Sequence, residues 1–311
     1  MTVKGVECGM WGVECEVTNE KFSISHYTLH IEEMFLSFYL MDSATWQKVL
    51  DLCNRLSGVT YENLTKIIRL EQSGSATRAR NLDDSFQNDV DSWMGGGTCF
   101  SMTWHLYQAF KDMGLSPRLV MGHKRKERNI HCALVLPDVS EPSSLTTHHT
   151  SHIPHFSSNP EFLFDPGYLI FDPLPIPLPA PFGTGEAFFP LVPNSVRLVR
   201  PAQDVLELWT GGAGGPMKLR FEYPLEGVSV EEFKQHWSES FYREMMTYPV
   251  LNRLDRDQGI QYYYQKGNLV IRDKDGSRME RIPEAERVEK LSEIFHIAPD
   301  LVERALGILK R

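Results

Sequence analysis

In one stretch of the chain, mostly apolar residues recur with the period of a helix more clearly than anywhere else. These positions follow the i, i+3, i+4, i+7 spacing of a single helical face, at Cys99, Met102, Thr103, Leu106, Phe110 and Met113. Gly114 and Pro117 come next, and a glycine followed by a proline is a common end of a helix. The pattern therefore predicts a helix that begins at Cys99 and ends at Gly114.

Two other helices are predicted upstream of this one. Residues 31–57 carry helical spacing, with one face made of Leu50, Cys53 and Leu56. Residues 59–74 form a second, shorter apolar segment that ends at a glycine. Residues 75–92 are polar, and they predict a loop before the glycines that precede Cys99.

Alternation with a period of two predicts strands further along. PRLVMGH (117–123) and NIHCALVLP (129–137) flank a charged turn and predict two neighbouring strands. Successive side chains of a strand point to opposite faces. In the second strand one face therefore holds His131, Ala133 and Val135, and the other holds Cys132, Leu134 and Leu136. Residues 138–160 are rich in Ser, Thr, Pro and His and predict an inserted surface loop.

The remaining segments are mostly β-rich and then mixed. Strands are predicted around the two Phe-Asp-Pro sequences and at 195–200, 205–209 and 217–223. A helix over 228–246, a hairpin over 260–273 and one or two helices over 284–311 follow. Residues 1–30 predict a short strand or hairpin. The order is helical, then β-rich, then mixed, so the predicted fold class is α+β.

Composition narrows the class of protein. At 311 residues the chain is long enough for two or three compact units, and its 41% hydrophobic content is ordinary for a globular protein. No apolar run approaches the roughly 20 residues that span a bilayer, so no membrane partner is expected. A net charge of -9 argues against general nucleic-acid binding, because no basic excess displaces phosphate counterions. The first residues lack the pattern of a secretory signal, so the cytoplasm is the expected compartment.

Neither the cysteines nor the histidines predict a metal site. The five cysteines are odd in number and form no CxxC pair, so neither a disulfide framework nor a cysteine metal site is expected. His148, His149, His152 and His155 are spaced like metal ligands on a helix. Pro154 and the Ser/Thr-rich surroundings instead predict a flexible loop.

The stretch GGGTCFSM at 95–102 raises a choice between binding phosphate and exposing a sulfur. A phosphate-binding Walker loop needs a lysine followed by Ser or Thr after the last glycine, whereas Thr98 and Cys99 stand there. A cysteine in the first turn of a helix is favoured as a thiolate by the positive end of the helix. Gly97 and Thr98 are small, and we expect them to let a substrate carbonyl approach and to leave backbone N–H groups free for an oxyanion.

A nucleophilic cysteine needs a histidine as base and an acidic residue to orient the ring. His131 lies on a definite face of a predicted strand after the helix, and Asp165 or Asp172 could complete the set. Each of these residues alone is typical of packing or of a strand end. Their combination and order predict a catalytic Cys-His-Asp triad.

The order and the motifs resemble those of the arylamine N-acetyltransferases. The family's Arg-Gly-Gly-x-Cys motif is similar to Gly96-Gly97-Thr98-Cys99, with Gly95 where the arginine is expected. The family's histidine lies in an apolar strand, as His131 does. The family's Asp-Val-Gly-Phe-Gly motif resembles Asp165-Pro166-Gly167-Tyr168, which selects Asp165 over Asp172. Tyr61-Glu62-Asn63-Leu64 resembles a family segment whose aromatic residue lines the acceptor pocket.

The resemblance implies a fold, a reaction and partners. It implies a helical domain with Cys99 (1–116), a β-barrel with His131 and Asp165 (117–224), and an α/β lid (225–311) around a cysteine-protease-like core. It implies transfer of an acyl group from acetyl-CoA or another acyl-CoA to an arylamine, hydrazine or hydroxylamine through an acyl-cysteine, with no permanently bound cofactor. Tyr61 and Tyr168 would line the acceptor pocket.

Some alternatives stay open at this stage. Ser101 and Thr103 replace the Glu and Asn that usually follow the family's cysteine. Transglutaminase-like hydrolases and other cysteine amidohydrolases or peptidases use the same triad order, and a non-catalytic interaction module would have an unreactive cysteine. The only dense basic cluster consists of Lys124, Arg125, Lys126 and Arg128. It is either a solvated hairpin tip or a site for the phosphates of CoA.

Overall fold

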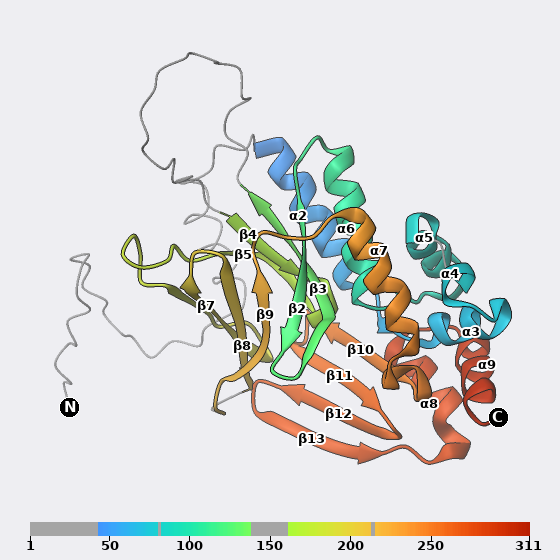
Figure 1. The fold of residues 1–311 in the computed structure, drawn as a ribbon. Helices are drawn as coiled ribbons and strands as arrows, with labels where there is room; N and C mark the ends of the chain where they lie inside the picture. The colour runs from blue at the N-terminus through green and yellow to red at the C-terminus, as the bar shows by residue number, and fades with distance from the viewer. Residues whose placement is uncertain (1–42, 80–81, 138–160, 213–214) are drawn as a thin grey trace, which may run out of the picture. The chain divides into compact units, whose positions relative to one another are not determined.

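The computed structural model describes residues 43–79, 82–137, 161–212 and 215–311, which all lie in the compact unit formed by residues 41–311 (Figure 1). The predictions for residues 1–30, for the start of the helix at 31–57, and for the loop at 138–160 with its four histidines lie outside the described residues. In the part of the chain that is described, no helix is both long and apolar enough to cross a membrane.

The first part of the described chain is helical. Its helices are α2 (Ser43–Ser57), α3 (Leu64–Ser73), α4 (Ala76–Ala79), α5 (Leu82–Trp93) and α6 (Cys99–Asp112). The predicted helix at Cys99 is confirmed at its first residue, and Gly114 follows it with a φ of 79°. The end predicted at Gly74 is also confirmed, since this residue caps α3 in the left-handed conformation.

Two predictions for this part are wrong. The segment 75–92 is helical, not a loop, because Leu82 and Phe86 are buried one turn apart and Asp89 is buried in an ion pair with Arg69. The helix expected from residue 59 begins only at Leu64. The residues before it form the short strand β1 (Tyr61–Glu62). This strand pairs antiparallel with a strand some 190 positions later, with Tyr61 opposite Asn252 and Glu62 opposite Leu251.

The middle of the chain forms an eight-stranded, barrel-like sheet in which every neighbouring pair is antiparallel. Its strand order is β5-β4-β3-β2-β9-β8-β7-β6. The strands are β2 (Arg118–Lys124), β3 (Glu127–Pro137), β4 (Glu161–Asp165), β5 (Ile170–Pro175), β6 (Glu186–Phe189), β7 (Asn194–Ala202), β8 (Val205–Gly212) and β9 (Lys218–Pro224). The predicted strands of this region are all present.

The two faces of β3 have different neighbours. Ala133 and Val135 belong to the apolar core of the barrel-like sheet, which agrees with the predicted alternation. The opposite face carries Cys132, and α6 packs against the strand. The Thr103 hydroxyl of α6 donates a hydrogen bond to the carbonyl oxygen of Cys132. The strand therefore brings the N-terminal end of α6 next to residues 131 and 132.

The last part of the chain combines a second sheet with helices. The sheet has the order β1-β10-β11-β12-β13 and contains β10 (Val250–Asp255), β11 (Ile260–Gln265), β12 (Asn268–Asp273) and β13 (Gly276–Arg281). The helices are α7 (Val230–Glu239), α8 (Arg287–Phe295) and α9 (Pro299–Leu309). The predicted helix over 228–246 is shorter than expected, because the chain continues after Glu239 as two 3₁₀ turns, Ser240–Tyr242 and Glu244–Thr247.

The expected fold class is confirmed. A helical part, a barrel-like sheet and an α/β part follow one another along the chain, as Figure 1 shows. The second sheet has its own apolar core, built with helices α3, α8 and α9. β1 belongs to this sheet, and Gly96 and Gly97, just before the cysteine helix, hydrogen-bond with Thr60 and Glu62. The start of the cysteine helix is therefore tied to the second sheet.

Candidate active site

The Asp165 carboxylate is fully buried and holds three donors. His131 Nε2 lies 2.7 Å from its Oδ1, and the backbone N–H of Tyr168 donates to the same oxygen at 3.0 Å. The Tyr223 hydroxyl donates to Oδ2 at 2.6 Å. Asp172, the other candidate aspartate, forms an ion pair with Arg256 and is about half exposed. The structure thus brings Asp165, and not Asp172, to His131.

The His131 ring is clamped between its aspartate and an aromatic ring. Phe221 stacks on the imidazole with a centroid distance of 4.2 Å and an interplanar angle of 13°. Burial opposes protonation of the ring, but the charge and the hydrogen bond of Asp165, together with those of Cys99, outweigh it and raise the pKa of His131 to about 10. The ring is therefore held as an imidazolium at neutral pH.

Cys99 is the first residue of α6 and is buried beside this imidazolium. A hydrogen bond from the Cys132 side chain lowers the pKa of the Cys99 thiol, and burial opposes this effect. The hydrogen bond and charge of His131 and the charge of Lys66 lower the pKa further, and the net result lies well below the ordinary 9.0. The shifts in the pKa of the Cys99 thiol and in that of the His131 ring thus both favour the charged forms, a thiolate and an imidazolium.

Gly167 is the residue that lets the cysteine and the histidine meet. A Cβ atom at position 167 would stand 2.3 Å from the Cβ of Cys99 and 2.8 Å from Cε1 of His131. No side chain fits there without displacing one of them. The turn after β4 therefore passes directly over the Cys99 and His131 side chains.

The glycines before Cys99 have a different role from the one expected. The N–H of Gly96 donates to the Thr60 carbonyl at 2.9 Å, and the N–H of Gly97 donates to Oε1 of Glu62 at 2.8 Å. A Cβ at Gly96 would lie 2.7 Å from Cγ1 of Val59. The expectation that these N–H groups are free for an oxyanion is wrong, because they join the loop tightly to the segment around β1.

The other expected substrate residues lie near Cys99 or near His131. Thr98 directly precedes Cys99, and its buried hydroxyl has no hydrogen-bond partner among the described residues. Tyr61 is buried on β1, where burial and the neighbouring Cys99 raise the pKa of its hydroxyl. The half-buried Tyr168 presents its ring edge-on to His131 at a centroid distance of 6.2 Å.

Lys66 is a buried cation that the sequence reasoning missed. Its side chain is almost fully buried, its Nζ donates to the Ser240 hydroxyl at 2.5 Å, and it lies over the Trp237 and Phe241 rings at 4.7 and 4.4 Å. Its charge acts on Cys99. The available signal was a lysine directly before two isoleucines in an apolar helix, a position at which charge is rarely buried.

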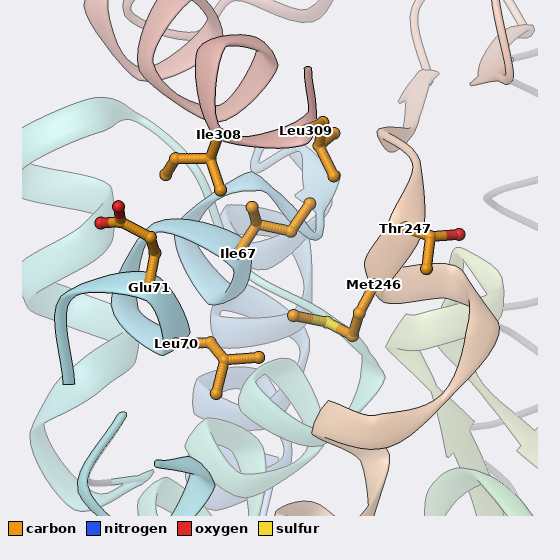
Figure 2. Close-up of a pocket in the computed structure, with 7 residues that line it drawn as sticks. All are labelled: Ile67, Leu70, Glu71, Met246, Thr247, Ile308 and Leu309. Atoms are coloured by element: carbon orange, nitrogen blue, oxygen red, sulfur yellow. The ribbon is translucent and has the colours of Figure 1, made fainter. Parts of the chain in front are cut away.

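Two surface cavities are lined by residues other than the three candidate residues. One of about 400 Å³ lies between α3, the Glu244–Thr247 turn and α9, and Figure 2 shows the mainly apolar side chains that line it. Another of about 450 Å³ is lined by residues of the same turn, of β11 and the turn that follows it, and of α8 and α9. Within the described ranges, no group of three or more acidic, histidine or cysteine side chains could hold a metal ion.

The basic cluster 124–128 lies at the exposed turn between β2 and β3. The Nζ of Lys124 stands 5.6 Å from the centroid of the Phe221 ring, which stacks on His131. The cluster is therefore solvated, as one of the two interpretations expects, and it also adjoins the candidate active site.

This arrangement of helix, barrel-like sheet and α/β part is the fold of the arylamine N-acetyltransferases. The structure of the enzyme from Nocardia farcinica is 19% identical, with a TM-score of 0.60, over 84% of this chain and 87% of that chain. The structure of the enzyme from Mycobacterium marinum is 16% identical, with a TM-score of 0.61, over 85% of this chain and 91% of that chain. The structure of the latter enzyme in complex with CoA is 17% identical, with a TM-score of 0.60, over 83% of this chain and 89% of that chain.

The likeness is one of fold and not of sequence. No family model matches the sequence, and no curated protein matches it either. At 16–19% identity the solved structures define the fold, and the chemistry has to be argued from the side chains themselves.

Proposed function

We propose that this protein is an acyltransferase that moves an acyl group, such as acetyl, from a CoA thioester to an arylamine, hydrazine or hydroxylamine. The observation that carries the proposal is the buried Cys99–His131–Asp165 arrangement, with its 2.7 Å His–Asp hydrogen bond and its lowered cysteine pKa. It lies in a fold shared with arylamine N-acetyltransferases, one of them determined in complex with CoA.

The proposed reaction has two steps that use the same residues in turn. The Cys99 thiolate attacks the thioester carbonyl, the bond from carbon to the CoA sulfur breaks, and the His131 imidazolium gives its proton to the departing thiolate. The now neutral His131 then accepts a proton from the amine as its nitrogen attacks the acyl-cysteine. The Cys99 thiolate leaves, and the original ion pair is restored. Asp165 fixes the ring and stabilises the imidazolium throughout.

The residues around the sulfur support this assignment on the acceptor side. Tyr61 and Tyr168 provide aromatic walls next to Cys99 and His131. Thr98 offers a buried hydroxyl directly before the nucleophile. Gly97, in contrast, has no N–H to offer the substrate, because its N–H is bound to Glu62.

The basic cluster supports a CoA donor. Lys124, Arg125, Lys126 and Arg128 are exposed on a turn that adjoins His131 through Phe221, and CoA carries phosphate groups that such side chains bind. Replacing Arg125 and Lys126 by Glu should raise the KM for acetyl-CoA about tenfold without changing alkylation of Cys99 by iodoacetamide. An unchanged KM would remove the cluster from the donor site.

The direct test is intact-mass detection of an acyl adduct after mixing the protein with acetyl-CoA, propionyl-CoA and malonyl-CoA. We expect one adduct on Cys99, none in Cys99→Ala, and an unchanged adduct in the control Cys53→Ala. Cys53 suits the control because burial raises the pKa of its thiol to about 12. An adduct lost to water at the same rate with and without amines would indicate a hydrolase, and Cys99→Ala with full turnover would overturn the proposal.

A further inference from the structure

The cavity of about 450 Å³ at the end of the second sheet contains none of the candidate catalytic residues. Its walls are β11 with the turn that follows it, the Glu244–Thr247 turn, and residues of α8 and α9. The proposed acyl transfer gives this cavity no role. Its charges and its unpartnered polar atoms, however, are arranged like those of a binding site.

Two arginine side chains meet over the glycine of the turn after β11. A Cβ atom at Gly267 would stand 3.2 Å from Cζ of Arg281 and 3.3 Å from Nη2 of Arg287. Arg281 is the last residue of β13, and Arg287 is the first residue of α8 and lines the cavity. Because the glycine has no side chain, the two guanidinium groups share the space above it.

The carboxylates of this cavity are already paired with lysines. Glu244 lies 2.8 Å from Nζ of Lys266, and Glu284 lies 2.6 Å from Nζ of Lys310. All four of these residues line the cavity. The two ion pairs therefore leave the arginines as its excess positive charge.

The arginines themselves have only weak neutral partners. Within the described ranges neither forms an ion pair, and Arg281 Nη1 donates to the Lys266 carbonyl at 3.5 Å and to Oδ1 of Asn268 at 3.3 Å. Two like charges held against the same glycine repel each other. An anion between them would turn this repulsion into two attractions.

Two buried polar atoms at the same place lack a hydrogen bond of normal geometry among the described residues. They are Nε of Arg287 and the hydroxyl of Tyr264, whose side chain is fully buried and which also lines the cavity. Burial raises the pKa of this hydroxyl, while the charges of Arg287 and Arg281 oppose the rise. Buried polar atoms usually have partners, and a ligand with several acceptor oxygens would supply them.

A second, mainly apolar cavity adjoins this one. The cavity of about 400 Å³ in Figure 2 shares Thr247 and Leu309 with it. The remaining side chains that line the second cavity are those of Ile67, Leu70, Glu71, Met246 and Ile308. A ligand that lies across both cavities would place a charged group at the arginines and an apolar group between α3 and α9.

We propose that the two adjoining cavities bind a small, soluble phosphate monoester with an apolar body, whose phosphate is held by Arg281, Arg287 and Tyr264. A phosphate monoester carries a charge of about −1.5 to −2 at neutral pH and has three strong acceptor oxygens. Guanidinium groups bind such oxygens by charge-assisted hydrogen bonds, and the phenol supplies one more donor. The inference does not rest on the proposed acyl transfer, because it uses none of the same residues.

Isothermal titration calorimetry with hexyl phosphate, inorganic phosphate and hexanol tests the site without any reaction. Wild type should bind hexyl phosphate at least about tenfold more tightly than either of the other two, because only this probe fills both cavities. Arg281→Gln and Arg287→Gln should each weaken hexyl phosphate binding about tenfold through the loss of one charged donor. Met246→Gln should weaken binding of hexyl phosphate and leave that of inorganic phosphate unchanged.

Two further variants separate the phosphate contacts from general effects of charge and folding. Tyr264→Phe keeps the buried ring but removes the hydroxyl, and it should also weaken hexyl phosphate binding. Arg278→Gln is the matched control, because Arg278 lies on β13 as Arg281 does, is exposed, and already pairs with Asp273 and Glu280. It should bind hexyl phosphate like the wild type.

Steady-state kinetics separate this site from the donor site. Arg281→Gln and Arg287→Gln should keep the wild-type KM for acetyl-CoA, and a raised KM would assign the arginines to CoA and overturn the inference. Unchanged hexyl phosphate binding in both variants would overturn it too. So would a wild type that binds phosphatidylcholine vesicles containing phosphatidate but not soluble hexyl phosphate. If no acyl transfer is found, the proposed function fails, and calorimetry still decides on this site.

Discussion

Gly167 approaches Cys99 so closely that a methyl group added to it would stand 2.3 Å from the Cβ of the cysteine. The same methyl group would stand 2.8 Å from Cε1 of His131. Gly167 also belongs to the turn whose next residue, Tyr168, donates its N–H to Asp165. The turn thus sets the positions of all three candidate catalytic residues at once.

Gly167→Ala should therefore separate Cys99 from His131. We expect kcat/KM for acyl transfer to fall about a hundredfold, as a misplacement of about 1 Å between reacting groups does, with an overpacking cost of about 1–3 kcal/mol. Steady-state kinetics and thermal unfolding measure the two effects. Gly307→Ala is the control, because nothing lies within 4 Å of its added Cβ. Equal activity of the Gly167 variant and wild type would contradict the arrangement.

Tyr223 is expected to position Asp165 through a single hydrogen bond. Its hydroxyl is the only described donor to Oδ2, and burial followed by the Asp165 charge raises its pKa, so it remains a phenol and donates. Tyr223→Phe should lower the free energy of unfolding by about 1–3 kcal/mol, because a buried charged acceptor loses its partner.

The same Tyr223→Phe change should reduce kcat about tenfold through the altered orientation of His131. It should leave the KM values nearly unchanged, since the tyrosine does not touch substrate. Chemical denaturation and steady-state kinetics are the measurements. A loss confined to stability, with kcat intact, would mean that Asp165 is held without the tyrosine.

Local patterns predicted the elements that hold the candidate catalytic residues. The helix at Cys99 and the strand with His131 each have a clear periodicity, and both were found where expected. The segment 75–92 was mispredicted because its composition is polar, whereas its folding depends on a few buried residues and an ion pair with Arg69. Composition alone does not distinguish a polar loop from a polar helix that packs along one edge.

The environment of the sulfur could not be predicted, because it is made by contacts between distant residues. Lys66 meets Ser240 across 174 positions, and the N–H of Gly97 meets Glu62 across 35. The glycines before Cys99 looked like an opening for substrate, but they allow close packing on the segment around β1. Whether a glycine leaves room for substrate or allows close packing depends on residues distant in the sequence, which a local pattern does not identify.

The Cys99–His131 pair predicts an unusual pH profile for alkylation. The pKa of Cys99 lies well below 9.0, and that of His131 is raised from 6.5 to about 10. The thiolate therefore persists well below pH 9, where an ordinary thiol takes up a proton, and the imidazolium persists as the pH rises to about 10. The rate of reaction with iodoacetamide should form a plateau over this window, whereas a free thiol loses about tenfold per unit below its pKa.

Peptide mapping across the pH range tests this profile. His131→Gln should abolish the plateau and move the half-point upward, because burial then acts without the imidazolium. Cys53, whose pKa is raised to about 12, should stay unmodified in the folded protein and serves as an internal control. A wild-type rate that falls steadily below pH 9 would exclude the ion pair.

The buried charge of Lys66 should stabilise the Cys99 thiolate. It is buried under Trp237 and Phe241, and its charge is one of the contributions that lower the pKa of Cys99. Lys66→Met keeps the volume and the apolar contacts but removes the charge, so alkylation at pH 7 should slow by about three- to tenfold. The rate at pH 10 should change little, because the thiolate then forms without help.

Lys66→Arg restores the charge and should recover most of the wild-type profile, which a purely structural role would not explain. Lys234→Met provides a matched control, because Lys234 also lies over an aromatic ring, that of Trp104, but is partly exposed and pairs with Asp83. Its profile should match wild type. If Lys66→Met and Lys234→Met show the same rates at pH 7, the buried lysine does not act on the sulfur. A shift seen only in Lys66→Met would identify it as the fixed positive charge of the site.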